Sequence, residues 1–222
     1  MTKKKSNPGE AILKVEKINY FDTTNVHRVK DVSFEVRSGE ILGVAGVSGN
    51  GQSELMDIIT GIRKLQSGKI EINNKIILPE MNFDSGTMRE LGLGHIPEDR
   101  QRRGLVTDFS ANENMILGHH KESAYNSFFE MDKISIVKTC TRNMKNFDVR
   151  PDNPFLKASL FSGGNQQKLV VAREIANDPK LLVVGQPTRG VDIGAIEFIH
   201  RQILNMRDAG KAVLLVSVEL DE

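Results

Sequence analysis

The amino-acid sequence predicts an α/β fold with a three-layer core, joined by an antiparallel β subdomain and a helical subdomain. Two observations predict the core. Short apolar segments at 41–45, 181–184 and 212–217 alternate with segments of helical spacing, and the first of them runs into a glycine-rich loop. Strands that alternate with helices form parallel sheets through right-handed crossovers, and short continuous apolar segments are typical of strands buried on both faces.

The antiparallel subdomain is predicted from alternating segments near the N-terminus. Apolar and polar side chains alternate strictly over 32–37 and partly over 13–18, and a further alternating segment at 69–72 follows a turn. Strict alternation indicates a strand with one buried face and one solvated face. We therefore expect these segments to form antiparallel strands outside the parallel core.

Helical spacing marks the segments 53–60, 163–176 and 195–207. Residues 110–147 also carry helical spacing with few strand signals, and a proline-containing loop follows them. Apolar residues that recur every three or four positions form one face of a helix. We expect a helical subdomain over about 108–160.

The composition excludes several classes of protein. The 222 residues include 30 Lys and Arg against 29 Asp and Glu, so the net charge of +1 lacks the basic excess of a nucleic-acid binder. A single cysteine, Cys140, excludes an internal disulfide and a cysteine-based zinc site, and no apolar run reaches the roughly 18–20 residues that span a bilayer. We expect residues 1–10 to form a disordered tail or linker and residues 11–222 to form the folded domain.

A candidate phosphate-binding loop follows the first apolar strand and opens a helix. It consists of Gly46, Val47, Ser48, Gly49, Asn50, Gly51, Gln52 and Ser53. The pattern G-x-x-x-x-G-K-[ST] is met except at the lysine, which Gln52 replaces, and Ser53 stands where the hydroxyl would bind Mg²⁺. A glycine turn between a strand and a helix that binds no ligand explains this segment about equally well.

Two further motifs favour the phosphate-binding interpretation. Ser-Gly-Gly-Asn-Gln-Gln-Lys at 162–168 precedes a helix, and Pro-Thr-Arg-Gly-Val-Asp at 187–192 follows an apolar strand. The order of the three motifs resembles the ATP-binding domain of ABC transporters over about 13–222. The resemblance implies a P-loop NTPase (RecA-like) core, with ATP and Mg²⁺ as cofactors.

The segment Pro-Glu-Asp-Arg at 97–100 narrows the resemblance. Together with the two motifs it looks like the second (C-terminal) half of the fused ATPases that serve importers of simple sugars and nucleosides. Glu98 then stands at the position of the glutamine loop. The resemblance implies the ATP-binding component of such an importer, and because the chain stops soon after its last strand we expect the domain to be truncated at its C-terminal end.

Four positions depart from the family's catalytic pattern. Gln52 replaces the loop lysine, Gly185 the aspartate of the Mg²⁺ shell, Gln186 the glutamate that polarises water, and Val218 the histidine at the γ-phosphate. Charge stabilisation is usually the largest contribution to such catalysis. Although the family hydrolyses ATP, we predict that this chain's own site is deficient in hydrolysis.

The signature loop, in contrast, matches the family. It comprises Ser162, Gly163, Gly164, Asn165 and Gln166. In the family each ATP lies between the phosphate loop of one domain and the signature loop of another, so these residues would act in trans on a partner's ATP, with Asp192 in the aspartate loop between the two sites. The implied partners are a second ATP-binding half, fused or separate, and membrane permease subunits.

The resemblance also implies an indirect link to an extracellular substrate-binding protein, no nucleic acid, and a cytoplasmic location on the inner face of the membrane. Two alternatives stay open: a soluble ABC-type ATPase without a transport role, and an interaction module that binds no nucleotide. An aromatic residue near the first strand would stack on adenine, and Tyr20 and Phe21 are both candidates, although either could be ordinary packing.

Overall fold

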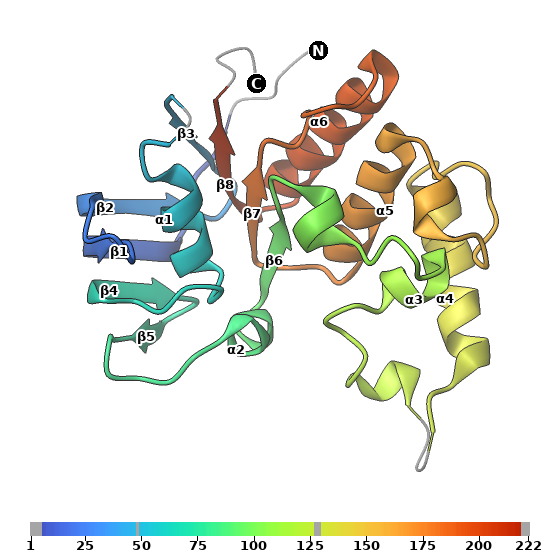
Figure 1. Cartoon of the computed structure of the whole chain (residues 1–222), viewed down its shortest axis with the longest axis horizontal. Helices are drawn as coiled ribbons and strands as arrows, with labels where there is room; N and C mark the ends of the chain where they lie inside the picture. Colours follow the sequence, from blue (N-terminus) through green and yellow to red (C-terminus); the bar gives the residue numbers. More distant parts are fainter. Residues whose placement is uncertain (1–5, 48, 127–129, 219–222) are drawn as a thin grey trace. The chain divides into compact units, whose positions relative to one another are not determined.

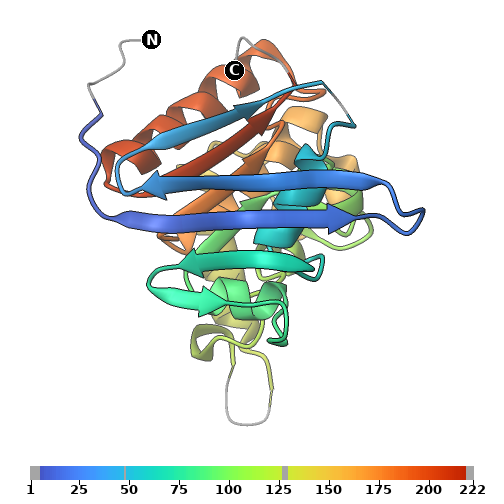
Figure 2. The same ribbon diagram turned by 90° about the vertical axis from the view of Figure 1, so that its left-hand side faces the viewer.

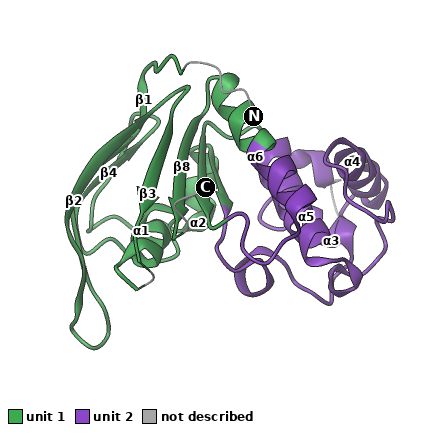
Figure 3. Cartoon of the chain, turned by 90° about the horizontal axis from the view of Figure 1, so that it is seen from above, with its two compact units in different colours: residues 1–95, 178–186, 201–222 green, residues 96–177, 187–200 purple. Residues whose placement is uncertain are grey.

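The computed structural model describes residues 6–47, 49–126 and 130–218. The chain forms two compact units, each with its own fold (Figure 3). Unit 1 comprises residues 1–95, 178–186 and 201–222, and unit 2 comprises residues 96–177 and 187–200. Among the described residues, no helix has both the length and the apolar character needed to cross a membrane.

Unit 1 contains a four-stranded antiparallel sheet (Figure 2). Its strands are β1 (Ala11–Phe21), β2 (His27–Arg37), β4 (Ser67–Ile72) and β5 (Lys75–Ile77), in the order β2-β1-β4-β5. The predicted antiparallel strands are confirmed, since β1 pairs antiparallel with both β2 and β4. Sequence reasoning missed β5, whose three residues are too few to show an alternation.

The second sheet of unit 1 carries the parallel strands. They are β3 (Ile41–Ala45), β6 (Leu93–Ile96), β7 (Leu181–Gly185) and β8 (Ala212–Ser217), in the order β3-β8-β7-β6. The pairs β3–β8 and β7–β8 are parallel, as predicted. The edge strand β6 was not predicted, because its four residues Leu-Gly-His-Ile form neither an apolar run nor a strict alternation.

Helix α1 (Gln52–Ile59) lies between the two sheets (Figure 1). Its apolar residues share one core with Leu13 and Ile70 of the antiparallel sheet and with Val183 and Leu214 of the parallel sheet, all fully buried. Burying one such side chain contributes about 1.5–3 kcal/mol. The predicted α/β fold is confirmed: α1 forms the middle layer between two sheets. The short helix α2 (Ser85–Glu90) is capped by Asp84.

Unit 2 is mostly helical. It contains α3 (Ala111–Met115), α4 (Lys133–Asn146), α5 (Gly163–Ala176), a π-helix at Arg100–Gly104 and the beginning of α6 (Ile193–Asp208). Helices α3, α4 and α5 pack against one another. The unit is larger than the helical segment expected over 108–160, because α5 and residues 187–200 pack with it.

The first described residues lie against the turn between β2 and β3. The Ser6 hydroxyl donates to the Gly39 carbonyl at 2.9 Å, and the Gly9 amide donates to the Ser38 carbonyl at 2.9 Å. This end of the predicted tail is therefore hydrogen-bonded to unit 1.

Candidate functional site

The glycine loop joins the end of β3 to the beginning of α1. Gly51 is the N-cap of α1 and has a φ of 94°, a conformation that glycine adopts without strain. A β-carbon at Gly51 would also collide with the Arg28 carbonyl of β2. Glycine is therefore required here twice, for the backbone turn and for the close approach of β2.

Gln52, at the lysine position, folds back over the loop. A β-carbon at Gly46 would collide with the amide nitrogen of its side chain. The amide is neutral, so the loop itself brings N–H groups and the positive end of α1 to an anion, but no full charge. Ser53 is exposed on the first turn of α1, and Ser48 lies outside the described residues.

A cavity of about 570 Å³ opens between β2 and the glycine loop. Its described lining includes His27, Arg28 and Lys30 and no carboxylate. Apolar residues of β2 and β3, among them Phe34 and Val44, line it as well. A glycine-rich wall, cationic side chains and an apolar wall suit a ligand that combines phosphate groups with a ring system.

Three of the four positions that depart from the family's catalytic pattern, 185, 186 and 218, lie at one edge of the parallel sheet because of the register of its strands. Ala45 pairs with Ser217, and Gly185 pairs with Val216. The glycine loop, Gln186 and Val218 directly follow these strands, and the Gln186 amide donates to the Val216 carbonyl at 2.8 Å. Ligands of open α/β sheets bind at this carboxyl edge, and here it carries neither a carboxylate nor an imidazole at positions 185, 186 and 218.

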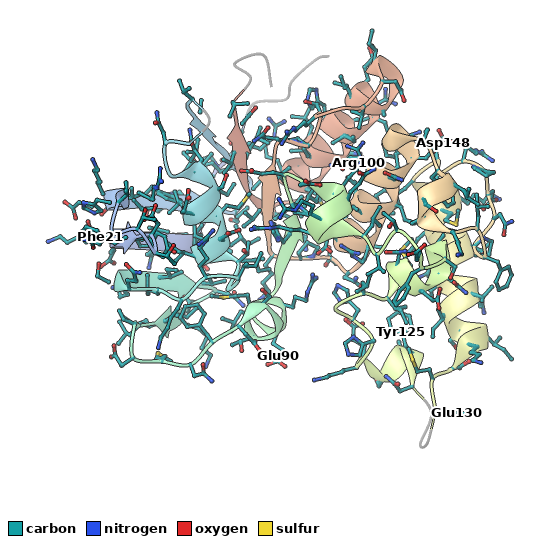
Figure 4. All side chains as sticks on the ribbon, viewed as in Figure 1. Phe21, Glu90, Arg100, Tyr125, Glu130 and Asp148 are labelled. Carbon is teal, nitrogen blue, oxygen red and sulfur yellow. The ribbon has the colours of Figure 1, made fainter. Side chains whose placement is uncertain are left out.

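The two aromatic candidates in β1 have different environments. Tyr20 is buried in the core, and its hydroxyl accepts a hydrogen bond of 3.0 Å from Arg63. Phe21 is 42% exposed and stacks on His27, with ring centroids 4.2 Å apart (Figure 4). His27 also lines the cavity, so Phe21 contacts a cavity-lining residue, whereas Tyr20 is buried in the core.

The signature loop opens helix α5 in unit 2. Ser162 is the N-cap, and its hydroxyl accepts hydrogen bonds from the backbone and side-chain nitrogens of Asn165, at 3.4 and 3.0 Å. The Asn165 side chain in turn accepts from the Arg150 amide at 2.7 Å. Gln166 is buried and donates to the Ala158 carbonyl at 3.0 Å, so its side chain holds the loop and is not presented to a ligand.

The aspartate loop, residues 187–192, packs directly against the signature loop. Asp192 caps α6 by accepting from the Ala195 amide at 2.8 Å. A β-carbon at Gly164 would lie 2.5 Å from the Asp192 carboxylate and 3.0 Å from the Ala195 β-carbon. Gly164 is therefore needed for the close packing of these two loops within unit 2.

The segment at 97–100 contributes a residue, Arg100, that is not among the predicted site residues. Asp99 caps the π-helix by accepting from the Gln101 and Arg102 amides, each at 3.1 Å. Arg100 then reaches both the signature loop and the aspartate loop (Figure 4). In the sequence, Arg100 belongs to a basic cluster with Arg102 and Arg103, and such a cluster is as compatible with a solvated turn as with a contact to phosphate or a partner. Glu98 is half-buried in the same segment.

Comparison with known proteins identifies the class to which this fold and these loops belong. Residues 29–189 match the family described as ABC transporter, so the chain belongs to that family. A solved nucleotide-free ATP-binding cassette from an ABC transporter has the same fold, with a TM-score of 0.78 and 23% identity over 96% of this chain and 83% of that one.

Several curated relatives are named import ATP-binding proteins. The chain is 44% identical over 220 residues to the guanosine import ATP-binding protein NupO of Bacillus subtilis, covering 99% of this chain and 42% of that protein. It is 38% identical over 217 residues to the glucose import ATP-binding protein TsgD13 of Haloferax volcanii, covering 97% and 39%. The chain thus spans about two fifths of the length of the curated relatives it matches.

Proposed function

We propose that the chain is the ATP-binding component of an ABC importer for simple sugars or nucleosides. Its own ATP site lacks the catalytic groups, and its intact signature loop serves the ATP site of a partner. The observation that carries the proposal is an asymmetry. The carboxyl edge of the parallel sheet lacks the catalytic side chains at 185, 186 and 218, and the glycine loop lacks the lysine at 52. The signature loop at 162–166, in contrast, keeps the residues of the family's motif, and Ser162 caps helix α5.

The chain's own site suits nucleotide binding without turnover. Gly49 and Gly51 both have a positive φ, a conformation that lets the backbone N–H groups of the loop converge on a phosphate. For Mg²⁺ the loop offers the Ser53 hydroxyl, while Gly185 has no side chain to hold its water shell. Gln186 has the length of a glutamate but cannot accept a proton from the attacking water. The chain would therefore bind ATP at this site without cleaving its γ-phosphate.

The signature loop serves the ATP of a partner half. The backbone amides of Gly163 and Gly164 lie in the first turn of α5, where N–H groups without helical partners favour an anion. Ser162 adds a hydroxyl at the same helix terminus. These groups would clamp the γ-phosphate bound to the partner, so that ATP closes the pair and hydrolysis releases it.

Unit 2 also offers a surface for a permease. A cavity of about 610 Å³ is lined by Phe109, Ile116, Ile136 and Phe155, and Phe155 is 67% exposed. Exposed apolar grooves of this kind mark interaction sites, and a short amphipathic helix would fill it. Docking to a permease at the inner face of the membrane, with a substrate-binding protein outside, completes the proposed importer.

The proposal is tested by restoring the missing groups. The variant Gln52→Lys, Gly185→Asp, Gln186→Glu, Val218→His returns the charge and the proton acceptor to the carboxyl edge. Radiolabelled ATP with Mg²⁺ then reports bound nucleotide and released phosphate in one tube. We expect the native chain to bind ATP without releasing phosphate, and the variant to bind roughly tenfold tighter and to release it, because charged hydrogen bonds to phosphate are strong.

The matched control is Val47→Lys, which adds the same charge to the loop at an exposed position and should not produce hydrolysis. Steady phosphate release by the native chain would contradict a deficient site. Failure of the native chain to bind ATP, with an intact thermal unfolding transition, would favour an interaction module that binds no nucleotide.

A further inference from the structure

Arg100 connects three segments of unit 2 that are far apart in the sequence. Its Nη1 donates to the Arg189 carbonyl at 2.8 Å, and its Nη2 donates to the Gly190 carbonyl at 3.2 Å. Its Nε lies 3.5 Å from the side-chain oxygen of Gln166. One guanidinium therefore reaches from the segment 97–100 to the aspartate loop and to the helix of the signature loop (Figure 4).

Two glycines make this approach possible. A β-carbon at Gly163 would lie 2.7 Å from Nη2 of Arg100 and 2.9 Å from the Gly190 carbonyl oxygen. Gly190 has a φ of 66°, which strains any residue with a side chain. The positions of Gly163 and Gly190 are thus matched to the guanidinium that lies against them.

A second contact fixes the backbone from which Arg100 extends. The Gln101 side-chain amide donates at 3.3 Å to the same oxygen of Gln166, and Gln166 donates at 3.0 Å to the Ala158 carbonyl. Gln166 is 4% exposed. With the Asp99 cap on one side and Gln166 on the other, Arg100 has little freedom to move independently of the signature loop.

The chemistry of the contacts favours an arginine. Its guanidinium donates to neutral acceptors of the described residues: two successive backbone carbonyls and an amide oxygen. A planar fork of donors can bond two carbonyls at once, whereas a lysine ammonium is a point charge on a flexible stem. Hydrogen bonds from a charged donor are about twice as strong as those between neutral groups.

We propose that Arg100 is a positioning residue that ties the segment 97–100 to the signature loop and the aspartate loop, so that a shift of this segment moves both loops together. Its role in catalysis rests on the proposed function, in which these loops complete the ATP site of a partner. Arg100 would then carry a signal from the segment that includes Glu98 to that site by direct contact, without an intervening chain of residues.

The structural part of the proposal is tested on this chain alone by hydrogen–deuterium exchange. In Arg100→Ala we expect amide exchange at 163–166 and at 188–192 to become at least about tenfold faster, because two charged hydrogen bonds are lost. Arg100→Lys should give a smaller increase at both loops. Arg102→Ala, which removes the same charge from an exposed neighbour, should leave both loops unchanged.

Exchange in Arg100→Ala that equals that of the native chain at either loop would overturn the proposal. An increase spread over the whole of unit 2 would overturn it as well, because Arg100 would then act on general stability. Both results are independent of whether the chain takes part in ATP hydrolysis.

The functional part is tested in a chimera in which this chain replaces the 220 residues that it matches in the guanosine importer ATPase of Bacillus subtilis. In Arg100→Ala we expect kcat for ATP to fall at least about tenfold while KM stays within threefold, because the partner's phosphate loop sets the affinity. Arg100→Lys should retain part of the native kcat, and the control Arg102→Ala should retain all of it. A native kcat in Arg100→Ala would overturn the coupling, whereas an inactive chimera with the native chain would contradict the proposed function instead.

Discussion

Tyr20 and Phe21 are neighbours in β1, yet they have opposite environments. Tyr20 points into the core and contacts Arg63, both through its hydroxyl and with the guanidinium 5.5 Å from its ring centroid. Phe21 points outward and stacks on His27. Successive side chains of a strand face opposite sides of a sheet, and Tyr20, like the buried Ile18 two positions earlier, lies on the side that faces the core.

This difference predicts separate effects of two substitutions. Phe21→Ala should weaken ATP binding roughly threefold to tenfold, since an aromatic stack contributes about 0.5–1.5 kcal/mol. Tyr20→Phe should leave ATP binding unchanged and lower the free energy of unfolding by about 1 kcal/mol, because Arg63 loses a hydrogen bond. Equilibrium ATP titration and urea unfolding measure the two effects. Equal ATP affinity in Phe21→Ala and the native chain would exclude Phe21 from the nucleotide site.

At the scale of elements, the N-termini of helices α5 and α6 both stabilise the structure and contain the candidate site residues. Ser162 caps helix α5 and Asp192 caps helix α6, and each side chain accepts a hydrogen bond from a backbone amide of the helix that it precedes. The Asp192 carboxylate also lies against Gly164. The caps therefore define where the two loops end and hold them together.

The Asp192 cap gives a prediction about stability. Asp192→Ala should lower the free energy of unfolding by about 1 kcal/mol, the usual effect of removing an N-cap acceptor. Asp192→Asn retains an acceptor oxygen and should lower the free energy of unfolding by only a few tenths of a kcal/mol, because it loses mainly the interaction of the charge with the helix dipole. Urea unfolding followed by circular dichroism distinguishes them. If both variants lose the same stability, the carboxylate has a role other than capping.

On the scale of the molecule, each unit has a buried interior of its own. Unit 1 has the core between its two sheets. In unit 2, Cys140 and Met144 of α4 are fully buried, and the buried Arg173 pairs with Glu174 at 2.8 Å while also donating to the Gly104 and Asn114 carbonyls. Removing one member of such a buried pair is strongly destabilising.

Cys140 is the sole cysteine of the chain and therefore reports on the opening of unit 2. Burial raises the pKa of its thiol to about 12. Since only the thiolate reacts, we expect a disulfide reagent at pH 8 to label the folded chain at least about a thousandfold more slowly than the chain in urea. Rapid labelling in buffer would show that unit 2 opens under native conditions.

The same raised pKa sets a direction for stability against pH. The folded chain holds the thiol proton more tightly than the unfolded chain, whose cysteine has a pKa of about 8.5. This contribution is fully present below about pH 8.5 and is lost as the pH rises from there toward 12. Cys140→Ser should therefore show a flatter decline of stability over this range.

The features that could be predicted from sequence are those encoded in neighbouring residues. The alternation at 32–37, the apolar segments of the parallel sheet and the glycine loop were all recognisable, because a strand or a turn depends on the pattern of a few adjacent side chains. The family resemblance rested on motifs of the same kind. Short elements such as β5 and β6 were missed, since three or four residues carry too little pattern.

The remaining features depend on residues that are distant in the sequence. The contacts of Arg100 lie 66 to 90 positions away, and the hydrogen bond that holds Tyr20 comes from a residue 43 positions away. A local pattern contains no information on such partners, because they meet only when packing fixes the register of strands and the approach of helices. For that reason the sequence identified the loops and their missing charges, whereas the fold showed which side chains hold those loops in place.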